Sequence, residues 1–263
     1  MKGLYYFDEM LRSKVEEADR QLHDGKYAES RRVIDAVYFM LGTKNIVELN
    51  FPFPISQYAL INLLTVRAQI YLVYHDYGTA DSMLTMTDII TRDTDMPPKE
   101  RVRLLLLKSN VMVMPNPLEH SLGLLSDALK IAESSGDRVL VTMAYMEMGK
   151  FMASEYTALG LSLIRKVETY CKRNKMKEGE IGAKVYRARC SYMMWTHDKY
   201  SWVKDRERFA KETVRLLDSI NPDEIKSQYN RDIYLGLKRD LEQYQQTNTN
   251  DNRLGQETGR TDQ

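Results

Sequence analysis

The chain has 263 residues, 43% of them hydrophobic, and a formal net charge of +1. This length allows one large core or one array of repeats, and the near-neutral total gives no reason to expect a polyanionic partner for the chain as a whole. The two cysteines, Cys171 and Cys190, have no CxxC spacing, which argues against a disulfide framework and fits a reducing compartment.

No membrane attachment or export is expected from the sequence. Acidic residues come too early in the N-terminal segment for a secretory signal, and no apolar run approaches the roughly 20 residues that a membrane span needs. We therefore expect a soluble, cytoplasmic protein.

Apolar residues at helical spacing predict helices along most of the chain. In chain order the helices are expected over residues 4–24, 27–41, 57–74, 79–92, 101–114, 118–136, 139–155, 159–174, 180–197, 200–220 and 223–245. The prolines of the FPFP sequence exclude a helix interior over 43–56, which is either a covering loop whose phenylalanines fill the core or a functional loop. The polar, glycine-containing residues 247–263 have no apolar period and are expected to be a disordered tail.

The segment 101–136 is the clearest helical hairpin. Its second half has an apolar stripe at intervals of three and four, which places one face against a neighbour, formed by Leu118, Leu122, Leu125 and Leu129 with Ala128 and Ala132. Pro117 suits the first position of that helix, and Gly136 suits its end. The first half is apolar almost all round, so we expect it to pack on two sides.

Weaker copies of this hairpin recur every 40 to 50 residues, a longer period than the roughly 34 residues of a common two-helix repeat. Comparable turn positions are followed, three residues later, by small or apolar residues: Tyr27 by Ser30, Tyr77 by Ala80, Pro117 by His120 or Ser121, Tyr156 by Leu159, and Tyr200 by Val203. Together with GKYAES (25–30), the set Ala68, Tyr71, Tyr77 and Ala80, and SLGLLSDALKIAESSGD (121–137), this resembles the tetratricopeptide-repeat superfamily. The fourth and fifth hairpins depart from its pattern in turn length, and its tryptophan-type positions are absent.

This resemblance implies an all-α fold, a right-handed superhelix of antiparallel helical hairpins over residues 1–246. In such a superhelix the first helix of each hairpin lines a concave groove that takes a peptide or a helix of a partner. Carried over by position, the residues facing the groove are Asn62, Gln69, Arg103, Asn110, Lys150 and Arg189. Asn and Gln can hold peptide amides, and Arg can grip a carboxylate; equally, these are ordinary polar positions on exposed helix faces.

No motif of a metal, nucleotide or catalytic site is present. The histidines are far apart and form no HxxxH or HExxH. The glycines form neither GxGxxG nor GxxxxGK[ST], and no serine stands in GxSxG. We expect no metal and no cofactor, and an enzyme is the least favoured class.

The segment 165–211 is rich in basic residues with interleaved aromatic ones. Such a mixture serves phosphate contact and base stacking, and it is equally typical of solvated helix faces with core aromatics. The candidate anion or nucleic-acid patch consists of Lys172, Arg173, Lys175, Lys177, Lys184 and Arg187. An acidic protein partner is the other ligand considered for it, and the acidic N-terminal hundred residues raise the prospect of a homo-oligomer formed head to tail.

The function predicted first is a protein-binding scaffold or adaptor that takes a peptide or helix in the groove. The alternative is a regulatory protein that contacts nucleic acid through 165–211, and a helical enzyme with an unrecognised site is the third.

Overall fold

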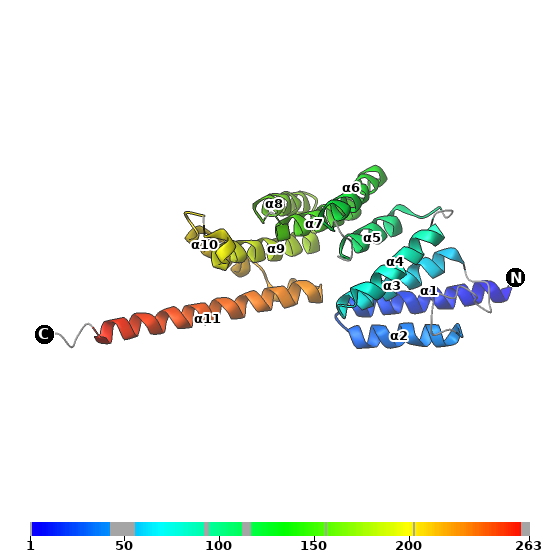
Figure 1. Ribbon diagram of the computed structural model, residues 1–263, viewed down its shortest axis with the longest axis horizontal. Coiled ribbons are helices and arrows are strands. Elements are labelled where there is room, and N and C mark those ends of the chain that lie inside the picture. Colours follow the sequence, from blue (N-terminus) through cyan, green and yellow to red (C-terminus); the bar gives the residue numbers. More distant parts are fainter. Residues whose placement is uncertain are drawn as a thin grey trace. The chain divides into compact units, whose positions relative to one another are not determined.

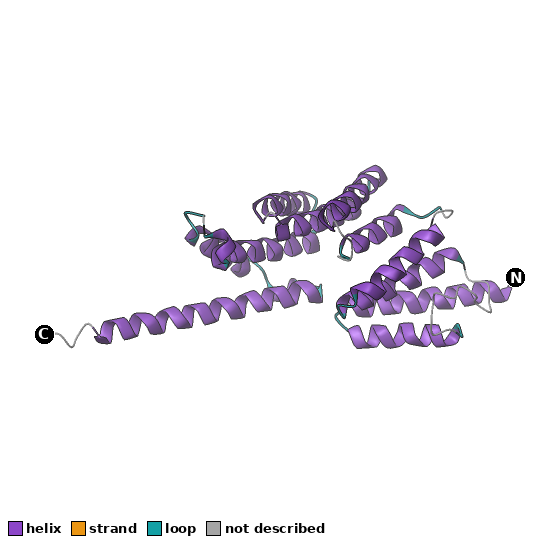
Figure 2. Cartoon of the chain, viewed as in Figure 1, coloured by secondary structure: helices purple, strands orange, loops and turns teal. Residues whose placement is uncertain are grey.

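The computed structural model describes residues 2–42, 56–91, 95–111, 117–155, 157–201 and 203–258. Within these ranges every regular element is a helix and no strand occurs (Figure 2). The predicted all-α class is therefore confirmed. The FPFP sequence and Tyr156, both singled out above, lie outside the described residues.

Eleven α-helices and two short 3-10 helices make up the described part of the chain. They are α1 (Lys2–His23), α2 (Tyr27–Met40), α3 (Gln57–Val73), α4 (Tyr77–Thr91), α5 (Pro98–Ser109), α6 (Pro117–Ser135), α7 (Arg138–Glu155), α8 (Thr157–Arg173), α9 (Lys177–Thr196), η1 (Asp198–Tyr200), α10 (Glu207–Asp218), η2 (Pro222–Glu224) and α11 (Gln228–Thr258). The sequence predicts one array over 1–246; the chain divides into two compact units, Met1–Met148 and Gly149–Gln263, each of which is described by itself.

Three antiparallel hairpins, α1 with α2, α3 with α4, and α5 with α6, make up the first unit together with the first part of α7, up to Met148 (Figure 1). The helix α3 also packs against α1 and α2, and α5 packs against α3 and α4. The near-continuous apolar character of α5 therefore serves packing on two sides, as predicted. The core is centred on α3, where burial continues around the helix and includes Leu60, Leu63, Leu64, Val66 and Ala68.

Small residues mark the closest approach within these hairpins. Three pairs, each twelve positions apart, are at most 2% exposed: Ala18 with Ser30, Ala68 with Ala80, and Ser109 with Ser121. The hydroxyl oxygens of Ser30 and Ser121 donate hydrogen bonds to the carbonyl oxygens of Ala18 (2.7 Å) and Ser109 (3.0 Å). Of the two candidates for the third position, His120 or Ser121, Ser121 is the buried one, and His120 is exposed.

Four of the turns between helices share one backbone form. A residue with positive φ follows the helix, namely Gly25, His75, Gly136 and Lys175. After Gly25, His75 and Lys175, the next amide donates back to the carbonyl five residues earlier, from Lys26 to Gln21, Asp76 to Tyr71 and Met176 to Cys171. These bonds satisfy carbonyl groups that the end of a helix leaves open. Gly136 is the helix stop that the sequence predicts.

The second unit is organised around α9, which packs against α8, α10 and α11. Its buried residues, such as Val185, Ala188 and Met194, occur around the helix, as three neighbours require. The repeat pattern predicts Leu159 as the packed residue at the α7–α8 contact. Leu159 is exposed, and the residue packed at this contact is Gly160. A Cβ atom on Gly160 would lie 2.3 Å from the Ala153 backbone nitrogen.

Three predicted helices differ from the observed ones. The helix predicted over 101–114 is α5, which already ends at Ser109. Instead of one helix over 200–220, the chain forms η1 and then α10, because the Tyr200 side chain is buried and its hydroxyl hydrogen-bonds to that of Thr157. Instead of a helix from 223, the Asn221 side chain caps η2 by accepting from the amide of Asp223 (3.1 Å). The following helix, α11, continues to Thr258, into the segment for which the sequence predicts disorder.

Candidate functional site: a polar groove of three first helices

A groove of about 240 Å³ lies in the first unit between α1, α3 and α5, the first helices of its three hairpins. Its apolar floor contains Val15, Ala59 and Val66, all buried. The polar lining residues are Arg12, Glu16, Asp19, Tyr58, Asn62, Lys99, Glu100 and Arg103. They recur at helical spacing on each helix, which places them on one face, and they include three basic and three acidic side chains.

Arg103 joins all three helices of the groove. Its two terminal nitrogens donate to both carboxylate oxygens of Asp19 on α1, and one of them also donates to the side-chain oxygen of Gln69 on α3 at 2.6 Å. The two-pronged contact fixes the orientation of the guanidinium plane. Because the Arg103 and Asp19 side chains remain 26% and 40% exposed, water screens the pair, and it contributes about 1 kcal/mol or less to stability.

A second series of polar contacts crosses the groove at Tyr58. The Tyr58 hydroxyl donates to a carboxylate oxygen of Glu100 on α5 (2.8 Å), and the Arg12 guanidinium of α1 lies 5.2 Å from the Tyr58 ring centroid. Partial burial, with the hydrogen bond to Glu100, raises the pKa of Tyr58, which keeps it a neutral donor. Two networks therefore hold three helix faces in fixed register, while Asn62 lies between them on the same lining.

The structure brings together three of the six residues predicted for the groove. Asn62 and Arg103 line it and Gln69 binds Arg103. Asn110 is not among the lining residues: it is exposed at the C-terminal cap of α5, where its amide donates to the carbonyl of Leu106 (3.1 Å). Lys150 and Arg189 belong to the second unit.

Lys150 and Arg189 meet on one tyrosine of α9. The Lys150 Nζ lies 4.8 Å from the Tyr186 ring centroid, and the Arg189 guanidinium carbon lies 5.8 Å from it. Tyr229 of α11 packs beside Tyr186, with 6.2 Å between ring centroids, and also lies within 5.4 Å of the Lys150 Nζ. In the second unit, an aromatic residue of α11 thus covers the surface at which these two candidates meet.

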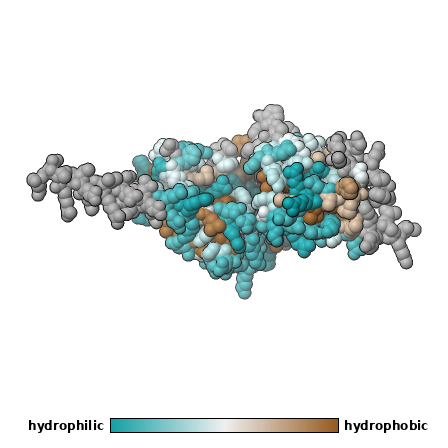
Figure 3. Space-filling model, turned by 90° about the horizontal axis from the view of Figure 1, so that it is seen from below, coloured by the Kyte–Doolittle hydropathy of each residue, from teal (hydrophilic) through white to brown (hydrophobic). Residues whose placement is uncertain are grey.

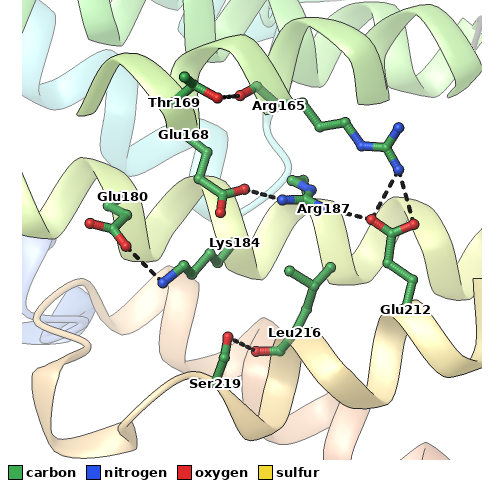
Figure 4. Close-up of polar contacts among 9 residues, drawn as sticks. All are labelled: Arg165, Glu168, Thr169, Glu180, Lys184, Arg187, Glu212, Leu216 and Ser219. Atoms are coloured by element: carbon green, nitrogen blue, oxygen red, sulfur yellow. Dashed lines mark hydrogen bonds and ion pairs between the residues drawn. The ribbon is translucent and has the colours of Figure 1, made fainter. Parts of the chain in front are cut away.

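Three residues of the predicted basic patch are paired with acidic side chains of the same unit. Arg187 of α9 lies between Glu168 of α8 and Glu212 of α10, and Arg165 adds two hydrogen bonds of 2.9 Å to Glu212 (Figure 4). Lys184 binds Glu180 at 2.7 Å, also in Figure 4. Lys177 lies 3.3 Å from Glu224. The contacts of Arg187 and Arg165 link α8, α9 and α10, whereas the Lys184–Glu180 pair lies within α9; together these pairs neutralise much of the local positive charge.

The other three patch residues, Lys172, Arg173 and Lys175, are exposed at the C-terminal end of α8 and the turn after it. There they complement the negative end of the helix dipole. The aromatic residues that alternate with the basic ones include Tyr186, Trp195 and Tyr200, which are 9% exposed or less. These three rings belong to the core and are not free to stack on bases, whereas Tyr170 and Tyr192 are half-buried.

Arg12, Asp19, Tyr58, Lys99 and Glu100 are groove residues that the sequence reasoning missed. A signal for them is present in the spacing of polar residues on the first helices, as in Arg12, Glu16 and Asp19. Spacings of four and three put these side chains on one helix face, beside the apolar stripe that contributes Val15 to the groove floor. Which of several polar faces meets another across a groove depends on helix packing, which this spacing does not encode.

The described residues give no support for a metal site, a membrane span or a reactive thiol. No group of three or more His, Cys, Asp or Glu side chains there could hold a metal ion. No described helix combines the length and apolar character of a membrane span. Cys171 and Cys190 are buried and not joined in a disulfide, and burial raises the pKa of Cys190 to about 11, which disfavours the reactive thiolate.

Hydrophilic side chains cover much of the face seen in Figure 3, with separate, smaller hydrophobic areas between them. No family model matches this chain, and neither a curated protein nor a solved structure does so.

Proposed function

We propose that this chain is a cytoplasmic scaffold or adaptor whose α1–α3–α5 groove binds a peptide or helix of a partner protein. The observation that carries the proposal is the groove itself, because it is lined by the first helices of three successive hairpins and contains Asn62 and Arg103. Its apolar floor and mixed polar walls offer side-chain burial and amide hydrogen bonding to one ligand.

The proposal includes a tetratricopeptide-like, right-handed superhelix of hairpins. It is supported by the recurrence of buried small pairs twelve residues apart, at steps that match the predicted 40 to 50 residues, and by the contacts of α3 with both helices of the preceding hairpin. The balanced charge of the groove favours a segment that carries both signs or polar groups over a purely anionic one.

Affinity in this scheme comes from contacts alone, so the chain is proposed to act without a cofactor and without bond-making chemistry. Nucleic-acid contact through 165–211 is weaker as a candidate. Arg187, Lys184 and Lys177 have acidic partners, and the rings of Tyr186, Trp195 and Tyr200 are buried and cannot stack on bases.

Photo-crosslinking tests the groove. A benzophenone side chain replaces Glu16 at the groove and, as a matched control, Arg32 on α2; both native residues are exposed. We expect Glu16-specific products from a cell extract, identified by mass spectrometry. A synthetic peptide of the crosslinked segment is then titrated against the native chain and the Asn62→Ala, Lys99→Glu and Lys26→Glu variants.

The groove assignment predicts that Asn62→Ala and Lys99→Glu each weaken binding about three- to tenfold, and that Lys26→Glu, an equal charge change on the exposed surface outside the groove, does not. Equal crosslinking from both positions, or affinities unchanged by the two groove variants, would reject it.

A further inference from the structure

A second pocket, of about 330 Å³, lies in the second unit between α8, α9 and α10. Its floor is apolar and consists of Leu161, Met194 and Phe209, each about 5% exposed or less. Its exposed rim includes Ala158, Arg165 and Arg208. A site of this volume with a buried apolar floor accommodates one large aliphatic or aromatic side chain.

The pocket continues into a shallow depression along α8, and Arg165 lines both. The depression is formed by one face of the helix, where Lys166, Thr169, Tyr170 and Arg173 follow Arg165 at helical spacing. Among the residues that line the two hollows, Arg165, Lys166, Arg173 and Arg208 are basic and Glu212 is the one acid. Since Glu212 already binds Arg165 and Arg187, this surface attracts negative charge.

We propose that this α8–α10 surface, formed by Ala158, Leu161, Arg165, Lys166, Arg173, Arg208 and Phe209, binds an acidic segment of a partner protein that inserts one apolar side chain into the pocket. The basic residues and the apolar pocket together determine the kind of partner. Carboxylates match the exposed basic residues Lys166, Arg173 and Arg208, and an apolar anchor removes the pocket floor from water. This surface is separate from the α1–α3–α5 groove and does not depend on the function proposed for it.

An acidic peptide fits this surface better than nucleic acid does. A single strand gains affinity from bases stacked on exposed rings, whereas Phe209 presents a buried ring at the bottom of a pocket shared with Leu161 and Met194, and Tyr170 in the depression is only half exposed. The spacing of the basic residues also follows one helix, from Arg165 to Arg173, a rise of about 12 Å. That length suits a short peptide segment with several carboxylates.

The test uses the full chain and a fluorescein-labelled peptide of twelve residues, made of glutamate and serine with one central leucine. Fluorescence anisotropy measures its binding at low and at physiological salt. A second peptide has serine in place of the leucine, and a twelve-nucleotide single-stranded DNA serves as the other polyanion. Circular dichroism checks that each variant remains helical.

Two variants separate the charge from the anchor. The triple variant Lys166→Glu, Arg173→Glu and Arg208→Glu changes exposed residues, and we expect it to weaken binding of both peptides at least about tenfold. The matched control, Lys226→Glu with Arg239→Glu, reverses exposed basic residues elsewhere in the same unit and should change affinity less than twofold. In Ala158→Phe, the new ring fills the pocket from its exposed rim.

The native chain should bind the leucine peptide about tenfold more tightly than the serine peptide, because the leucine side chain is buried, and Ala158→Phe should abolish this preference without weakening binding of the serine peptide. Absence of peptide binding at low salt, equal binding of the two peptides, or an unaltered preference in Ala158→Phe would overturn the proposal. If the native chain binds the DNA more tightly than the leucine peptide, and the triple variant loses this DNA binding, the proposal is overturned in favour of a nucleic-acid surface.

Discussion

The hydroxyl of Ser30 donates a 2.7 Å hydrogen bond to the carbonyl oxygen of Ala18, and both residues are fully buried. The bond joins α2 to α1 at a point where neither helix has room for a larger side chain. The equivalent bond from Ser121 to Ser109 joins α6 to α5. Two hairpins of the first unit thus combine close packing with satisfaction of a buried hydroxyl.

Substitution of Ser30 should separate these two effects. Ser30→Ala keeps the size and loses the hydrogen bond, so we expect a loss of about 1 kcal/mol in the free energy of unfolding. Ser30→Leu also overpacks the contact and should cost a further 1–3 kcal/mol or so. Thermal and urea unfolding followed by circular dichroism measure both. Ser13→Leu on the exposed side of α1 is the control, and an equal loss there would refute the packing argument.

The close contact between α7 and α8 should leave room only for glycine at position 160. Gly160→Ala places a Cβ atom 2.3 Å from the backbone nitrogen of Ala153, so α7 and α8 must separate, and we expect a loss of about 2–3 kcal/mol. Gly236 in α11 has nothing within 4 Å of an added Cβ. Gly236→Ala should therefore stabilise its helix by up to about 1 kcal/mol. In thermal unfolding we therefore expect Gly160→Ala to lower the melting temperature and Gly236→Ala to raise it. Stabilisation by Gly160→Ala would contradict the close contact.

Positive φ angles at two non-glycine residues predict stabilising substitutions. Lys175 has φ +55° and His75 has φ +60°, at the turn position where Gly25 and Gly136 stand elsewhere. Glycine removes the steric cost of this conformation, so Lys175→Gly and His75→Gly should each raise stability by about 0.5–1 kcal/mol. Gly136→Ala should lower it by a similar amount, although nothing lies within 4 Å of the added Cβ. Unchanged melting temperatures in all three variants would argue against a strained turn.

The charged network around Arg187 predicts a pH dependence. Burial raises the pKa of Glu212, but hydrogen bonds from Arg187 and Arg165 outweigh burial and hold the pKa below its ordinary value of 4.5. Glu212 therefore stabilises the fold fully above pH 4.5, and this contribution is lost as the pH falls through its lower pKa in the folded chain. We expect melting temperatures to fall below about pH 4.

The Glu212→Gln variant isolates that contribution. At pH 7 it should be less stable by about 1–3 kcal/mol, because Arg187 loses one of its two carboxylate partners while largely buried. Between pH 5 and pH 3 it should lose less stability than the native chain. Glu242→Gln on the exposed surface of α11 is the control. A variant with the native pH profile would show that Glu212 does not carry the effect.

Local sequence alone determined the helical class and most helix positions. Apolar residues at intervals of three and four specify which face of a segment must be buried, and Pro117 and Gly136 mark helix ends through backbone geometry. The buried small residues Ser30 and Ala80 were also identifiable, because they recur at one distance after a turn. The buried hydroxyl of Tyr200 was not, and for that reason the predicted helix over 200–220 was wrong at its start.

Tertiary structure decided which polar residues share a site. Of the six residues predicted for the groove, Asn62, Gln69 and Arg103 lie together with Asp19, which the sequence did not single out. Lys150 and Arg189 meet at Tyr186 instead, and Arg187 is held between two carboxylates. Sequence periodicity specifies a face of one helix, whereas a groove or an ion network requires the faces of several helices to meet, and that depends on how closely packed side chains allow the helices to approach.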